Sequence, residues 1–157
     1  MHNRQLYILA DDCTLTVDGG INVSAGNSFT VYAQEAGTGV LTATGGSKQA
    51  GIGGAEQQGG GTITIHGGNI TAQGGSTGAG IGGGSKGSGG TITIHGGNIT
   101  AQGGFSGAGI GGCKIRIYLN LISGIIAHGN HIDLSQGLFF SISCCCLINS
   151  CYGLTRL

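Results

Sequence analysis

Two nearly identical segments follow one another in the middle of the chain: GTITIHGGNITAQGGSTGAGIGGGSKGSG at residues 61–89 and GTITIHGGNITAQGGFSGAGIGG at residues 90–112. The first begins at Gly61 and the second at Gly90, so the period of the repeat is 29. The same offset aligns VLTATGGSKQAGIGGA at 40–55 with NITAQGGSTGAGIGGG at 69–84. Repeats with periods of about 20 to 50 residues indicate a solenoid, in which each repeat forms one coil and neighbouring coils stack.

Within one repeat the local period is two, which is typical of a β-strand. In the run TITIH, Ile63 and Ile65 share one face. The polar residues Thr62, Thr64 and His66 share the other face. Isoleucine and threonine are β-branched and favour extended backbone. The alternation therefore predicts strands with an apolar inner face and a polar outer face.

Glycine pairs separate these short strands, at 67–68, 74–75 and 82–83. Glycine turns a corner at little steric cost. The sequence therefore predicts an all-β fold, a single-stranded parallel β-helix with about 29 residues per coil and coils about 4.8 Å apart. Residues one period apart should then stack into columns. The expected columns are Ile52, Ile81 and Ile110; Ala50, Ala79 and Ala108; and Leu41, Ile70 and Ile99.

A looser copy of the repeat precedes these units. TLTVDGGINVSAG at 14–26 aligns with TITIHGGNITAQG if one residue is inserted, which places Asp18 where His66 and His95 lie. FTVY at 29–32 is expected to be a further strand. We divide the repeat region, residues 1–112, into units at about 11–39, 40–61, 62–90 and 91–112.

Composition excludes several classes of protein. The chain holds 37 glycines but no proline, so it lacks the composition of collagen. Its 39% hydrophobic content at fixed spacings argues against disorder. A formal net charge of zero argues against binding to nucleic acid or to an anionic membrane surface. No signal peptide is recognisable, and the longest apolar-leaning stretch, 138–148, is too short to span a bilayer.

The repeat stops at Cys113, and residues 113–157 have a different composition. Of the 37 glycines only four lie in this tail, together with five of the six cysteines. The tail is either a cap that closes the end of the solenoid or a segment translated out of frame. The abrupt change and the CCC run at 144–146 favour the second interpretation. The alternation in KIRIYLNLI at 114–122, typical of an edge strand, favours the first.

The repeats carry a small set of candidate binding residues. A Thr-x-Thr array on one flat face could bind sugar hydroxyls or ice, or could only reflect β-propensity. Thr14 and Thr16 are assigned to this array as well. The asparagines could form an amide ladder, and the histidines recur at one outward position. These candidates are Thr62, Thr64, Thr91, Thr93, Asn69, Asn98, His66 and His95.

Other chemistry has little support in the sequence. Two histidines without a third ligand make a poor zinc site, and HGNH at 128–131 has no cysteine pair at the spacing of a common zinc finger. GGGSKGSGG at 82–90 lacks the spacing of a phosphate-binding loop. Carboxylates are too few for a glycosidase pair. We expect no cofactor, no metal and no catalysis.

The run GTITIHGGNITAQGG followed by GAGIGGG resembles glycine-rich repeats of exported and cell-surface proteins of gut bacteria, in which the pattern reads GGTITINGGTVTATGGSGGAGIGGG. The resemblance extends over about residues 11–112 and includes GNSFTVYAQEAGTGVLTATGG at 26–46. Such proteins are described as carbohydrate-binding-domain-containing and resemble right-handed parallel β-helices. The resemblance implies an extracellular or cell-surface location.

We therefore interpret the chain as a non-catalytic carbohydrate-binding or adhesive repeat module. The resemblance implies that it is a fragment of a longer exported bacterial protein with further domains, and that its partner is a polysaccharide or other glycan. Two alternatives remain open. The first is a structural stalk or spacer without a ligand, and the second is an ice-binding Thr-x-Thr face.

Overall fold

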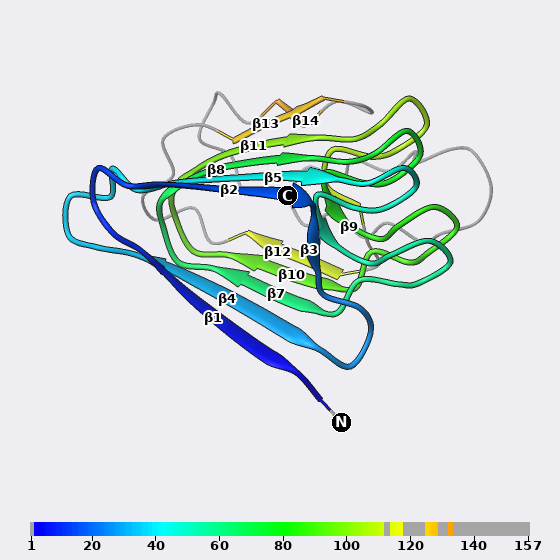
Figure 1. Cartoon of the computed structure of the whole chain (residues 1–157), viewed down its shortest axis with the longest axis horizontal. Helices are drawn as coiled ribbons and strands as arrows, with labels where there is room; N and C mark the ends of the chain where they lie inside the picture. The colour runs from blue at the N-terminus through cyan, green and yellow to red at the C-terminus, as the bar shows by residue number, and fades with distance from the viewer. Residues whose placement is uncertain (1, 112–113, 118–124, 129–131, 134–157) are drawn as a thin grey trace, which may run out of the picture.

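The fold is a three-sided parallel β-helix (Figure 1). The computed structural model describes residues 2–111, 114–117, 125–128 and 132–133. The strands form three sheets, A, B and C. Successive strands along the chain belong to sheet A, sheet B and sheet C in turn, and the next strand returns to sheet A one coil further along. This confirms the all-β solenoid that the repeats predict. No helix that could cross a membrane occurs among the described residues.

Each sheet collects one strand from each successive coil. Sheet A runs in the order β1 (Arg4–Leu9), β4 (Ser28–Ala33), β7 (Thr62–Ile65), β10 (Thr91–Ile94) and β12 (Lys114–Ile117). Sheet B runs in the order β2 (Thr14–Gly19), β5 (Val40–Gly45), β8 (Asn69–Gln73), β11 (Asn98–Gln102), β13 (Ile125–His128) and β14 (Ile132–Asp133). Sheet C consists of β3 (Ile21–Asn22), β6 (Ile52–Gly53) and β9 (Ile81–Gly82).

Parallel pairing places equivalent residues directly over one another. Thr62 pairs with Thr91 in sheet A, and Asn69 pairs with Asn98 in sheet B. Both pairs have the offset of 29 that the repeat predicts. The earlier coils are less regular, because Ser28 pairs with Thr62, an offset of 34.

The core is built of stacked columns of hydrophobic side chains. The predicted column of Ile52, Ile81 and Ile110 is confirmed, with exposed fractions of 0%, 0% and 8%. Ile21 extends it by one coil, because it pairs with Ile52. The other columns are Phe29, Ile63 and Ile92; Val31, Ile65 and Ile94; Leu41, Ile70 and Ile99; and Ala43, Ala72 and Ala101. All of these are buried.

The close stacking of coils requires glycine at the sheet C turn. Gly82 has φ = +139°, a conformation that residues with a side chain rarely adopt. A Cβ atom at Gly82 would also collide with the carbonyl oxygen of Gly111 in the next coil. Gly53 occupies the same position one coil earlier, with φ = +142°. The glycines therefore let one backbone lie directly on the next.

The alignment of the first copy is wrong in its register. Thr14 pairs with Val40 and Asp18 with Thr44, so β2 lies in sheet B. Asp18 is therefore not equivalent to His66, and neither Thr14 nor Thr16 extends the threonine face of sheet A. The error arose because alternation identifies a strand but not the sheet that it joins. The sheet A strand of the first coil is β1, which precedes the residues that the repeat alignment covers.

The start of the tail continues the solenoid. β12 pairs in parallel with β10 and β13 with β11, while β14 pairs with β13 in the antiparallel direction. A strand within KIRIYLNLI is therefore confirmed at Lys114–Ile117. The five tail cysteines and most of HGNH lie outside the described residues, as does the stretch 138–148. Whether the tail is a cap or an out-of-frame segment stays a prediction.

Removing one isoleucine from the sheet C column should leave a cavity that neighbouring coils cannot fill. Ile81 is fully buried between Ile52 and Ile110. We expect Ile81→Ala to lower the free energy of unfolding by about 2–5 kcal/mol, measured by urea denaturation. The control Thr71→Ala, at an exposed site on β8, should change it by less than about 0.5 kcal/mol. Equal effects of the two variants would contradict the buried column.

Gly37 and Gly82 both have a positive φ, but only Gly82 lies against the backbone of another coil. Substitutions at the two positions therefore distinguish the cost of backbone strain from the cost of a steric collision. Gly37 has φ = +66° and open space around it, whereas Gly82 has both a positive φ and a blocked Cβ site. We expect Gly37→Ala to cost about 1–2 kcal/mol through strain alone. Gly82→Ala should cost clearly more, because two coils must move apart. Calorimetric melting of both variants tests this order, and equal melting temperatures would contradict it.

Candidate functional site: a groove at the corner of sheets A and B

The repeated run TITIHGGNIT folds into the corner between sheets A and B. His66 follows the last residue of β7, the glycines at 67–68 make the turn, and Asn69 begins β8. The same arrangement recurs with His95 and Asn98 in the next coil. The corner therefore presents a column of rings on one side and a column of amides on the other.

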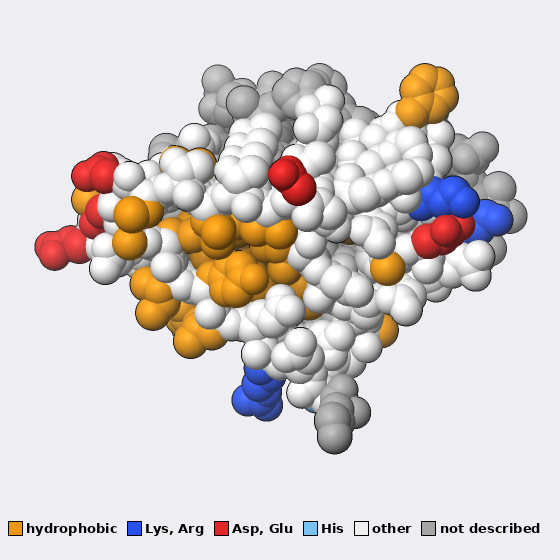
Figure 2. Space-filling model, in the orientation of Figure 1, with side chains coloured by type: hydrophobic (Ala, Val, Ile, Leu, Met, Phe, Trp, Pro, Cys, Tyr) orange, Lys and Arg blue, Asp and Glu red, His pale blue; other side chains and the backbone are white. Residues whose placement is uncertain are grey.

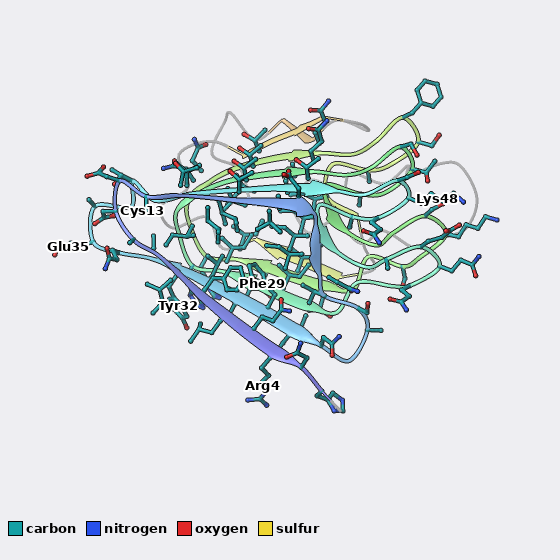
Figure 3. All side chains as sticks on the ribbon, viewed as in Figure 1. Arg4, Cys13, Phe29, Tyr32, Glu35 and Lys48 are labelled. Carbon is teal, nitrogen blue, oxygen red and sulfur yellow. The ribbon has the colours of Figure 1, made fainter. Side chains whose placement is uncertain are left out.

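The ring column consists of Tyr32, His66 and His95. The rings of Tyr32 and His66 lie 4.2 Å apart between centroids, with an angle of 2° between their planes. The rings of His66 and His95 lie 4.6 Å apart at 4°. Parallel strands spaced by about 4.8 Å impose this stacking. The side chain of Tyr32 points outward from β4, whereas that of Phe29 on the same strand points into the core (Figure 3).

Beside the ring column lies an open groove of about 380 Å³, which we call the corner groove. Its volume lies within the range of about 300–1,000 Å³ that small-molecule sites occupy. It is lined by Tyr32, Ala33, Gln34, Gly37, His66, Gly67, Gly68, Asn69, Gly97 and Asn98. The corner glycines have no side chains to fill this space, so the groove is a direct product of the repeat.

One rim of the corner groove is a loop held in place by hydrogen bonds. The side-chain nitrogen of Asn69 donates to the carbonyl oxygens of Gly37 (3.2 Å) and Thr38 (3.3 Å). The carboxylate of Asp11 accepts bonds from the backbone N–H groups of Ala36 (3.1 Å) and Thr38 (3.2 Å). The loop at 34–38 is therefore anchored from two neighbouring coils, which gives the groove a preformed wall.

Electrostatically the corner groove is close to neutral. No Asp, Glu, Lys or Arg is among its lining residues. Partial burial lowers the pKa of His66, and the neighbouring charge of His95 lowers it further. At physiological pH His66 is therefore held in its neutral form, in which one ring nitrogen donates a hydrogen bond and the other accepts one.

The structure brings together only part of the predicted site. His66, Asn69 and Asn98 line the corner groove, and His95 stacks on His66. The four threonines lie apart from it, on the outer face of sheet A. They are in register as predicted and form the threonine face, which consists of Thr62, Thr64, Thr91 and Thr93.

Sequence reasoning missed Tyr32 and Gln34 as groove residues. FTVY is predicted as a strand, and its alternation places Tyr32 on the outer face together with Thr30. The contact with His66 nevertheless depends on the offset of 34 between these coils, which a repeat with a period of 29 does not reveal. Gln34 enters the groove because its loop folds back, where its Oε1 atom accepts a bond from the Asp11 N–H at 2.9 Å.

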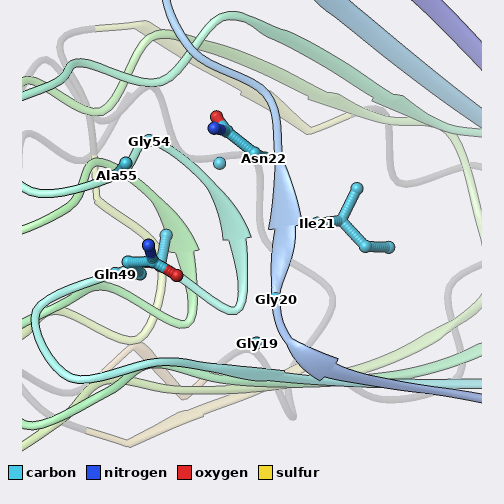
Figure 4. A pocket seen from close by; sticks show the side chains of 9 residues that line it. Gly19, Gly20, Ile21, Asn22, Gln49, Gly54 and Ala55 are labelled. Atoms are coloured by element: carbon cyan, nitrogen blue, oxygen red, sulfur yellow. The ribbon is translucent and has the colours of Figure 1, made fainter.

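Other features of the described residues offer less room for a ligand. A hollow beside β3 measures only about 10 Å³, enough for about one water molecule. Asn22 and Gln49 lie on one side of β3 there, and Ile21 on the other (Figure 4). Within residues 2–111 and the three short segments beyond, no three His, Cys, Asp or Glu side chains cluster as metal ligands.

Comparison with known proteins agrees with the architecture. A family model described as a beta helix repeat matches residues 36–56, 63–85 and 92–112. The chain therefore resembles beta helix repeats over these three segments, and its fold is that of a parallel β-helix. Each matched segment of this β-helix contains one sheet B strand, and the last two also contain most of a sheet A strand. No curated protein and no solved structure matches the chain.

The ring column should affect the pKa of His66. We expect its pKa, measured by NMR, to lie below the usual value of about 6.5. The unfolded chain then binds this proton at a higher pH than the folded chain does. The free energy of unfolding should consequently fall as the pH is lowered from about 6.5 through the folded pKa.

A substitution separates the two causes of this shift. His95→Gln keeps a side chain beside His66 but removes the positive charge, so the pKa of His66 should rise only in part, because burial is the larger cause. Thr62→Ser, on the threonine face, should leave it unchanged. A His66 pKa at or above about 6.5 in the unmodified protein would contradict the stacked arrangement.

Proposed function

We propose that this β-helix is a non-catalytic carbohydrate-binding or adhesive module that binds a polysaccharide or other glycan at the corner groove. One observation carries the proposal: two rings of the ring column, those of Tyr32 and His66, line one open groove together with the amides of Asn69 and Asn98, and no Asp, Glu, Lys or Arg is among its lining residues. Neutral sugars present many hydroxyl groups that both donate and accept hydrogen bonds. The tyrosine hydroxyl, the neutral imidazole of His66 and the side-chain amides are suitable partners for them.

Repetition along the solenoid supports a polymeric ligand. Equivalent groups recur in successive coils at a spacing of about 4.8 Å, since His95 follows His66 and Asn98 follows Asn69. A polysaccharide likewise repeats its hydroxyl pattern along its length. Contact would occur through ring edges rather than ring faces, because the inner faces of the ring column cover one another.

The absence of catalysis is part of the proposal. Glycoside hydrolysis generally needs two carboxyl groups on either side of the bond to be cleaved. The corner groove is lined by none. The Glu56 carboxylate instead pairs with Lys48 at 2.8 Å in an exposed loop, and Asp11 is engaged by backbone N–H groups. The groove can therefore hold a sugar but has no acid and base to cleave it.

The biological setting follows from the resemblance to glycine-rich surface repeats. We propose that the module acts outside the cell or on the cell surface and that further domains accompany it in a longer parent protein. A module with several shallow sites suits adhesion, because many weak contacts on one chain add up.

A second candidate function rests on the threonine face. Thr62 and Thr64 lie in register with Thr91 and Thr93, which is the regular array that an ice-binding surface needs. The array is short along the solenoid, since Leu6 and Lys114 take equivalent positions in the two outermost strands of sheet A. Thermal hysteresis of the purified protein would favour this candidate over the corner groove.

Glycan arrays followed by calorimetry of the best ligand distinguish these candidates. We expect Tyr32→Phe, which keeps the ring but removes its hydroxyl, to weaken binding by about two- to tenfold. Asn98→Ala should weaken it by a similar factor. The control Thr62→Ala/Thr91→Ala alters only the threonine face and should leave affinity within about twofold.

The opposite pattern identifies the alternatives. Loss of binding in Thr62→Ala/Thr91→Ala, with Tyr32→Phe unaffected, would move the site to the threonine face. Absence of binding to every glycan, together with absence of thermal hysteresis, would make the module a structural spacer.

A further inference from the structure

The first coil leaves the hydrophobic core open at one end of the solenoid. The inner residues of β5, β8 and β11 are buried between two neighbouring strands, whereas among the described residues no strand lies in front of the inner residues of β2. Leu15 is 41% exposed, whereas its partner Leu41 is fully buried. Tyr7 and Val17 are only partly buried against the core. Hydrophobic side chains accordingly gather on this face, over β1 and β2 (Figure 2).

The same end presents unpaired strand edges. β1, β2 and β3 are each the terminal strand of their sheet among the described residues. A terminal strand offers free backbone N–H and C=O groups, which readily pair with another chain. An apolar surface with strand edges on all three sides is therefore a surface that suits a further β-coil.

We propose that a second copy of this chain covers the open end, so that two solenoids meet head to head about a twofold axis. Such an axis, perpendicular to the solenoid, reverses the direction of each strand and exchanges two of the three sheets. If it exchanges sheets A and B, β1 meets the partner's β2 in the antiparallel direction, and β3 meets its own copy. β1 and β2 are both six residues long. Exchange of sheets B and C would instead set β2 against the two-residue β3.

Charge and side-chain direction select the register of this pairing. Residues directly opposite each other in an antiparallel pair point to the same side. Setting Arg4 opposite the partner's Asp18 also sets Tyr7 opposite the partner's Leu15, so that the inner faces continue one core. A register shifted by two residues would place the apolar Leu6 opposite the partner's Asp18.

Arg4 and Asp18 are suited to this role. Both are exposed, and neither forms an ion pair within the part of the chain that the structure describes. Within one copy they lie on different sheets, β1 in sheet A and β2 in sheet B. Figure 2 shows a basic side chain on one side of the apolar patch and an acidic one on the other. The twofold axis brings opposite charges together twice, which makes the surface complementary to itself.

The proposed dimer has a consequence that rests on the proposed function. The axis passes through the corner of sheets A and B, so both corner grooves lie along the same edge of the assembly. Two grooves on one edge could engage one polysaccharide chain together, which raises its apparent affinity without any new contact.

The oligomeric state of the full chain tests the dimer without reference to any ligand. We expect light scattering after size exclusion to report twice the chain mass of 15.4 kDa. Reductant must be present, because six cysteines could otherwise cross-link the chains. Leu15→Arg places a charge in the joined core and should give a monomer.

Charge reversal tests the register. Arg4→Asp and Asp18→Arg each create two like-charge pairs, so each should raise the dimer dissociation constant by at least about tenfold. The double variant Arg4→Asp/Asp18→Arg should restore dimerisation. Lys86→Asp, at an exposed loop position with φ = +60° that aspartate tolerates, is the matched control and should have no effect.

Three outcomes would overturn the proposal. These are a monomer at all concentrations, a dimer that persists in Leu15→Arg, and a double charge reversal that fails to restore dimerisation. Circular dichroism of every variant verifies that the solenoid is folded. Glycan binding is measured separately, so failure of the dimer and failure of the proposed function are distinguishable.

Discussion

The structure depends on in-register parallel pairing between successive coils. Each strand forms hydrogen bonds to a strand one coil away, so a residue meets its own equivalent at a fixed spacing of about 4.8 Å. Ile81 therefore lies between Ile52 and Ile110, and backbone lies on backbone at Gly53 and Gly82. A single coil buries its aliphatic side chains only when another coil covers them, which explains both the repetition of the sequence and the need for glycine where the turns stack.

The same constraint generates the candidate site. Stacking of equivalent positions lines up His66 with His95 and Asn69 with Asn98, although nothing in one repeat by itself forms a groove. The glycines between them leave the corner open, and the loop at 34–38 adds a wall that Asp11 and Asn69 hold in place. The candidate site thus arises from the same in-register pairing that builds the core. This explains why the groove is lined by polar residues without Asp, Glu, Lys or Arg: neutral polar groups can stack in columns, whereas stacked like charges would repel one another.

The first coil differs from the middle coils in how much of its hydrophobic surface is covered. The strands of the middle coils pair on both edges, but within the part of the chain that the structure describes the first coil leaves Leu15 and Val17 of β2 and three strand edges without a neighbouring coil. In this chain the first coil is the least regular one, and it carries Arg4 and Asp18 instead of the hydroxyl groups and amides of the later repeats. This irregular coil is the one that we propose pairs with a second copy of the chain.

The sequence alone determined the architecture of the regular coils. The period of 29 and the alternation in TITIH and NITAQ were enough to predict the β-helix, the isoleucine column and the outward histidines, because each follows from local spacing. The first coil was assigned to the wrong sheet because alternation looks the same in every sheet. Tyr32 was missed because the offset between its coil and the next is 34 and not 29. Only the tertiary structure decided which strand lies above which, and hence that a tyrosine completes the ring column and that a groove opens beside it.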